Sequence, residues 1–128
     1  MSHNKIFNFI QYNEKIATSG QPESDEFALI AKNGIASIIN LAMPNSDGAL
    51  ANEGQIVTAL GMNYFHIPVP FDQPSVEHLV LFIKLMQSLS NKNVWVHCVA
   101  NYRVSAFMYQ YQRKIYDMPE KKAKSPSV

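Results

Sequence analysis

The sequence predicts an α/β domain with a mostly parallel central sheet of about four to five strands, flanked by helices. Short apolar segments alternate along the chain with longer segments in which apolar residues recur at spacings of three and four. This alternation is typical of strands and helices that follow one another in a parallel sheet. Gly, Pro and Asn recur between the segments, where turns are expected.

The first half of the chain contains four of the expected strands and two short helices. The strands are expected at residues 6–10, 16–18, 36–41 and 64–69. Ser24 is expected to cap the first helix, which Asn33 and Gly34 would end. The second helix is weaker and is expected over residues 55–60.

The second half has clearer helical periodicity. Ser75 is expected to cap a helix with apolar residues at Val76, Leu79, Val80, Ile83 and Met86. A strand at residues 94–97 follows, and then an amphipathic helix with apolar residues at Val104, Phe107, Met108, Tyr111 and Ile115. Parallel strands end at one edge of a sheet, so the loops after Leu41, Val69 and His97 should open together, where open α/β folds bind ligands.

Composition limits the classes of function. The chain has 128 residues and a net charge of +1, which predicts one domain over residues 1–118 with a basic flexible tail at 119–128 and argues against a nucleic-acid partner. No apolar run reaches the roughly 20 residues of a membrane span. The single cysteine and the lack of a visible secretory signal favour a cytoplasmic location. The four histidines lack ligand spacing, so we expect no metal or other cofactor.

The most informative stretch is residues 94–105, which predicts a strand, a tight loop and a helix. Cys98 lies at the turn and Arg103 at or near the start of the helix. Backbone N–H groups at a helix N-terminus favour both an anion and a cysteine thiolate. A thiolate facing bound phosphate is a nucleophile, and Arg103 could hold two phosphate oxygens. The alternative is that Cys98 is a small buried apolar residue.

Residues 97–105, HCVANYRVS, resemble the phosphate-binding loop of cysteine-dependent protein tyrosine and dual-specificity phosphatases. Residues 17–22, 38–41 and 64–69 resemble, in order, the bacterial phosphatase-like family found fused to beta-lactamase-like hydrolases. The resemblance runs from about residue 15 to 115 and implies a dual-specificity-phosphatase-like fold.

The resemblance also implies roles. Cys98 would form a phosphocysteine intermediate, Arg103 would clamp the phosphate, His97 would orient the loop, and Ser105 would assist departure of the thiolate. The other residues expected to contact the phosphate are Val99, Ala100, Asn101, Tyr102 and Val104. The implied partner is a phosphorylated small molecule or a phosphoprotein, and the site should bind phosphate-like anions. No membrane partner is expected.

A general acid is needed to protonate the leaving oxygen. Asp72 lies in the loop after the strand at 64–69 and should share an edge of the sheet with Cys98, whereas its alternative role is that of a turn residue. Asp47, in the loop after the neighbouring strand, is the second candidate. Asn40 and Ser19 are expected to support the site.

Two features of the loop keep other functions open. Four residues separate Cys98 from Arg103 where most of these phosphatases have five, and Asn101 replaces the expected mid-loop glycine, although asparagine tolerates left-handed backbone. The short gap also matches rhodanese-like sulfurtransferases, in which Cys98 would carry a persulfide. A pseudophosphatase that binds phosphate without turnover is the alternative outside enzymes.

Overall fold

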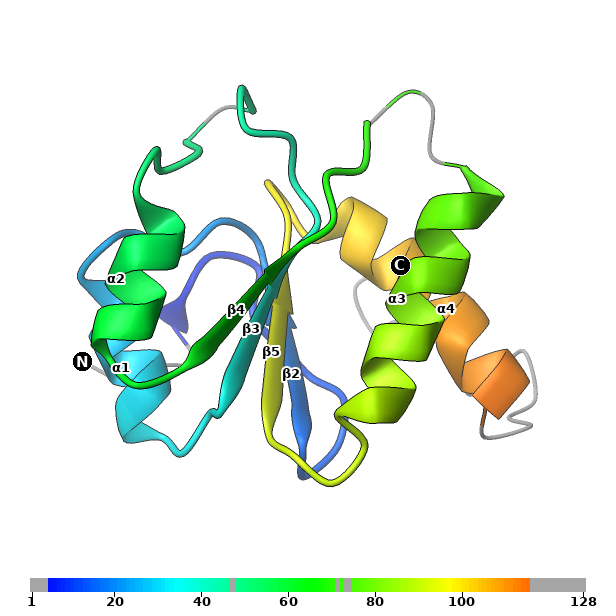
Figure 1. The fold of residues 1–128 in the computed structure, drawn as a ribbon, viewed down its shortest axis with the longest axis horizontal. Coiled ribbons are helices and arrows are strands. Elements are labelled where there is room, and N and C mark those ends of the chain that lie inside the picture. Colours follow the sequence, from blue (N-terminus) through cyan, green and yellow to red (C-terminus); the bar gives the residue numbers. More distant parts are fainter. Residues whose placement is uncertain (1–4, 47, 71, 73–74, 116–128) are drawn as a thin grey trace.

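Parallel strands form the centre of the molecule and pairs of helices cover its two faces (Figure 1). The computed structural model describes residues 5–46, 48–70, 72 and 75–115. The strands are β1 (Ile10–Gln11), β2 (Ile16–Ser19), β3 (Ser37–Asn40), β4 (Asn63–His66) and β5 (Val94–His97), in the sheet order β1-β2-β5-β3-β4. Only β1 runs antiparallel to its neighbour. The predicted α/β fold with a mostly parallel sheet is therefore confirmed.

The helices are α1 (Glu26–Lys32), α2 (Glu53–Ala59), α3 (Val76–Ser88) and α4 (Tyr102–Ile115). Alternating side chains of the central strand β5 face opposite layers. Trp95 packs with Phe27 of α1 and Val57 of α2, whereas Val94 and Val96 join the cluster under α3 and α4. All four residues of β5 are buried, which explains why this strand is a continuous apolar run in the sequence.

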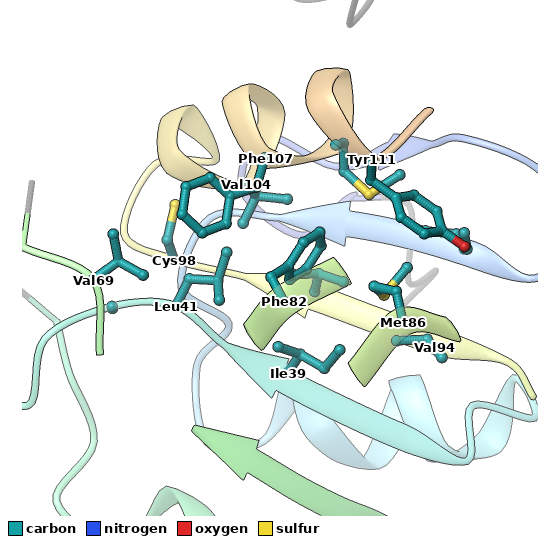
Figure 2. Packing of buried hydrophobic residues seen from close by; sticks show 14 residues of the cluster. Ile39, Leu41, Val69, Phe82, Met86, Val94, Cys98, Val104, Phe107 and Tyr111 are labelled. Atoms are coloured by element: carbon teal, nitrogen blue, oxygen red, sulfur yellow. The ribbon is translucent and has the colours of Figure 1, made fainter. Parts of the chain in front are cut away.

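The larger apolar cluster joins the sheet to α3 and α4 and reaches the predicted site. The apolar stripe of α4 contributes Val104, Phe107, Met108 and Tyr111, as its periodicity predicted. Figure 2 shows Cys98 at one end of this cluster, near the start of α4 and close to Leu41. The thiol therefore lies where the core meets the carboxyl edge of the sheet.

Two expected elements differ from the structure. The expected strand at residues 6–10 is wrong for most of its length, because β1 begins only at Ile10 and the preceding segment turns, with Phe9 N donating to Ile6 O. Asp25 rather than Ser24 is the N-cap of α1, and its side chain makes no capping hydrogen bond.

Other boundaries moved less. β4 ends at His66, although the backbone N–H groups of Ile67 and Val69 still donate to β3 and to the residue after it. The Ser75 cap of α3 is confirmed and forms a capping box with His78. The predicted tail at 119–128 lies outside the described residues, and among those described no helix is long and apolar enough to cross a bilayer.

The loops after β3, β4 and β5 rise from one edge of the sheet, at the top of Figure 1. Strand β5 pairs in parallel with both β2 and β3, so the segments that follow β2 and β3 flank the loop that carries Cys98. This arrangement positions the candidate site.

Candidate active site

Cys98 and Arg103 line one pocket at the carboxyl edge of the sheet. The pocket has a volume of about 420 Å³, and its other lining residues are Asn45, Ser46, Val99, Ala100 and Tyr102. The first two belong to the loop after β3, and the rest to the loop between β5 and α4 or to the start of α4. Sequence reasoning thus identified the Cys98 side of the pocket and missed Asn45 and Ser46.

The loop at residues 98–101 has each of its four carbonyl oxygens bound by a donor. His97 Nδ1 lies 3.3 Å from the Cys98 oxygen, Gln21 N donates to Val99 (2.8 Å), Asn8 Nδ2 to Ala100 (2.9 Å) and Ser105 N to Asn101 (3.0 Å). In a trans peptide the N–H points opposite to the carbonyl that precedes it. The N–H groups of residues 99–102 are therefore turned away from these donors, as an anion-binding loop requires.

Asn101 makes the sharp turn of this loop. Its φ is +71°, the left-handed conformation in which asparagine is tolerated and glycine is common. Its buried side-chain amide donates to Asn8 O (2.9 Å) and to Thr18 Oγ1 (3.0 Å). Asn8, with φ of +54°, returns a hydrogen bond to Ala100 O, so the loop and the N-terminal segment hold each other.

Arg103 is the second residue of α4, and only 9% of it is exposed. Its Nη1 donates to Val69 O at 2.8 Å, which ties the loop after β4 to the pocket. The neighbouring Val104 is fully buried in the core, so its side chain cannot reach the pocket and only its backbone N–H could serve an anion.

The two candidate acids are placed unequally. Asp72 is exposed, three residues beyond the Val69 carbonyl that Arg103 holds, and is not among the residues that line the pocket. Asp47 lies outside the described residues, although the preceding Ser46 lines the pocket. The role of each carboxyl group as an acid stays a prediction.

A buried pair of a histidine and a glutamate lies behind the cysteine. His97 Nε2 is 2.6 Å from Glu53 Oε2, and the two side chains are 0% and 2% exposed. Glu53 Oε1 also accepts a hydrogen bond from Gln21 Nε2 at 3.0 Å. Sequence reasoning missed Glu53, because a glutamate in the first turn of a short helix normally lies in solvent.

Tyr64 belongs to the same polar group. Burial raises the pKa of its phenol to about 12, the hydrogen bond from Asn40 opposes this shift, and the negative charge of Glu53 adds to it. Asn40 also accepts from Ala42 N at 2.8 Å and so shapes the start of the loop after β3. Ser19 accepts from Trp95 Nε1 (2.8 Å) beneath the site. Asn40 and Ser19 do not line the pocket, and their supporting role stays a prediction.

Ser105 is 4% exposed, and its hydroxyl has no hydrogen-bond partner among the described residues. It lies one turn of helix after Asn101, to whose carbonyl its backbone N–H donates. Within the described part of the chain no three His, Cys, Asp or Glu side chains are grouped as a metal site would need.

Comparison with known proteins relates both the sequence and the fold of this chain to phosphatases. Residues 14–108 match the family described as "Polymorphic toxin system, DSP-PTPase phosphatase". Two beta-lactamase hydrolase-like proteins of Xylella fastidiosa, from strains Temecula1 and 9a5c, are each 33% identical over 98 residues. That similarity covers 73% of this chain but only 22% of the length of those relatives.

Solved structures are also similar. A DUF442 protein of Shewanella putrefaciens CN-32, described as a candidate phosphatase, has a TM-score of 0.88 and 37% identity over 94% of this chain and 81% of that one. The active form of Tk-PTP has a TM-score of 0.78 and 20% identity over 91% of this chain and 79% of that chain. Pseudomonas aeruginosa TpbA in complex with pTyr has a TM-score of 0.74 and 13% identity over 91% and 69%. The last two show a shared fold alone.

Asn101→Gly should destabilise the protein, and Asn101→Ala should destabilise it more. Glycine keeps the left-handed turn but loses two hydrogen bonds, at a cost of about 1–3 kcal/mol, and alanine adds a left-handed penalty of roughly 1–2 kcal/mol. Urea denaturation measures both. Asn33→Ala, which removes an exposed side-chain hydrogen bond at the end of α1, is the control and should change the free energy of unfolding by less than about 0.5 kcal/mol. Equal stability of all three variants would mean that the turn does not depend on Asn101.

Arg103→Ala should weaken tungstate binding by roughly ten- to a hundred-fold, the loss expected for one charge-assisted contact. Arg103→Lys should restore only part of the affinity, because a lysine lacks the guanidinium fork. Isothermal titration calorimetry measures the change, and Arg113→Ala, on an exposed turn of the same helix, should bind tungstate like the wild type. Unchanged affinity in Arg103→Ala would exclude Arg103 as the clamp.

Proposed function

Because the chain belongs to the polymorphic toxin system DSP-PTPase phosphatase family, we propose that it hydrolyses phosphomonoesters through a phosphocysteine on Cys98. The observation that carries the proposal is the shared pocket of Cys98 and Arg103, around a loop whose carbonyls are all bound. No residue in this proposal requires a metal or a cofactor.

The first step would transfer the phosphoryl group to sulfur. The Cys98 thiolate attacks phosphorus, the S–P bond forms and the P–O ester bond breaks. Arg103 and the N–H groups of the loop would hold the equatorial oxygens, where charge accumulates as the group transfers. The start of α4 adds its positive dipole end to this site.

The leaving oxygen needs a proton as the ester bond breaks. We propose Asp72 as the donor, because the hydrogen bond from Arg103 to Val69 holds the base of its loop beside the pocket. Asp47 is the second candidate, because Ser46 before it lines the pocket. The aspartate that gives up its proton then accepts one from water in the next step.

The second step would release phosphate. Water attacks phosphorus, its proton passes to the aspartate, the S–P bond breaks and the thiolate is restored. The Ser105 hydroxyl is buried and unpaired among the described residues, so it has hydrogen-bonding capacity for the departing thiolate. The substrate would be a phosphorylated small molecule or a phosphoprotein.

Wild-type protein should release p-nitrophenolate from p-nitrophenyl phosphate, and acid-quenched samples should contain a protein species heavier by one phosphoryl group. Cys98→Ser should abolish both signals while tungstate binding persists. Rapid-quench kinetics with intact-protein mass spectrometry measures the result. Tungstate binding without turnover would indicate a pseudophosphatase, and thiocyanate formed from thiosulfate and cyanide would indicate a sulfurtransferase.

Asp72→Asn should slow hydrolysis of alkyl phosphates by about 10²–10⁴-fold, the usual contribution of a general acid. It should slow p-nitrophenyl phosphate much less, because nitrophenolate leaves without protonation. Steady-state kinetics on both substrates provides the comparison, with Asp25→Asn, an exposed helix-capping residue, as the control. Equal losses on the two substrates would make Asp72 structural, and the same test on Asp47→Asn would then identify the acid.

A further inference from the structure

The buried carboxylate of Glu53 has no role in the chemistry proposed above. It belongs to the first turn of α2, yet it is 2% exposed and touches the residue before the nucleophile. Glu53 and His97 form a carboxyl–imidazole pair that is almost completely removed from water. The burial of this carboxyl group needs an explanation, because the removal of a charged group from water costs free energy.

The ring of His97 faces oxygen acceptors on both sides. Nε2 lies 2.6 Å from the Glu53 carboxylate, and Nδ1 lies 3.3 Å from the carbonyl oxygen of Cys98. Carboxylate and carbonyl oxygens are acceptors, so each ring nitrogen faces an oxygen to which an N–H group can donate. The 2.6 Å distance is typical of a strong, charge-assisted hydrogen bond.

The second oxygen of Glu53 reaches the other side of the loop. Oε1 accepts from the side chain of Gln21, whose backbone N–H in turn donates to the carbonyl of Val99. One carboxylate therefore contacts both residues that hold the Cys98 and Val99 carbonyls. Glu53 also directly follows the loop between β3 and α2, and this loop carries Asn45 and Ser46, which line the pocket.

We propose that Glu53 is a positioning residue of the phosphate-binding loop. Through His97 and Gln21 it turns two successive loop carbonyls outward, so that the following N–H groups face the anion. The proposal rests on the proposed function for its catalytic consequence, although its effect on His97 and on anion binding does not require turnover.

A merely stabilising role explains the pair less well. Buried ion pairs can often be replaced by apolar side chains without loss of stability, whereas removal of one partner is costly. The apolar ring of Phe27 already packs 6.1 Å from the His97 ring, so an apolar environment exists there. What an apolar residue could not do is donate to, or hold, a loop carbonyl.

The test compares Glu53→Gln with the wild type. Glutamine has nearly the same shape but no charge, so the hydrogen bond at His97 Nε2 should change, and ¹⁵N–¹H correlation spectra of the ring nitrogens detect this change directly. Tungstate affinity should fall by roughly three- to thirty-fold, as for residues that act through a neighbour. On p-nitrophenyl phosphate, kcat/KM should fall while circular dichroism stays unchanged.

Matched variants separate positioning from general effects. Glu77→Gln removes an exposed first-turn glutamate from α3 and should leave every readout unchanged. Glu53→Asp keeps a carboxyl group on a shorter side chain, so it should restore part of the wild-type His97 ring spectrum and part of the tungstate affinity. If Glu53→Gln does not fold, Glu53→Asp is compared with the wild type instead. Its shorter side chain lengthens the contacts with His97 and Gln21, so its tungstate affinity should be lower than that of the wild type.

The outcomes distinguish this proposal from the proposed function. Wild-type protein that binds tungstate without turnover contradicts the function and leaves the Glu53 measurements valid. An active wild type with identical His97 spectra and tungstate affinity in Glu53→Gln overturns the role of Glu53 alone. A wild type with no affinity for tungstate overturns both.

Discussion

The structure of the site depends on four consecutive carbonyl oxygens in the loop after β5. Each of them points away from the pocket side of the loop, toward a hydrogen-bonding partner elsewhere in the chain. The donors come from separate parts of the chain: His97 at the end of β5, Gln21 after β2, Asn8 before β1 and the first turn of α4. The sheet order makes this possible, because β2 lies directly beside β5. Gly20 shows how close the approach is, since a Cβ there would lie 2.6 Å from Val99 O.

The same constraint explains how a short loop can still present both Cys98 and Arg103. The left-handed turn at Asn101 reverses the chain in one residue and lets α4 begin at Tyr102. Arg103 then lies in the first turn, beside the pocket, and Val104 begins the apolar stripe that anchors the helix in the core. A one-residue shift would place a guanidinium in the apolar cluster and a valine beside the pocket, which the cost of an unpaired charge among apolar side chains opposes.

The fold was predictable because its signals are local and periodic. The β5–loop–α4 unit and the apolar stripe of α4 follow directly from spacing, and the phosphatase-family resemblance read from residues 97–105 is confirmed by the family match. What failed depends on long-range contact. The segment before Ile10 reads as a strand because it is apolar, but it turns at Asn8 to hold a loop 92 residues away. Glu53 gave no signal, because nothing in its surroundings in the sequence shows that it will be buried against His97.

Local rules of folding are broken together at this one edge of the sheet. Among the described residues, the non-glycine positions with positive φ are Asn8 and Asn101, and they hydrogen-bond to each other's segments. The buried Glu53–His97 pair lies behind the same loop, and Gly20 lies against it. Each feature costs free energy in isolation, of the order of 1–3 kcal/mol for a left-handed residue. These features are concentrated around Cys98. We infer from this that the fold is less stable than it could be because it holds this loop in one conformation.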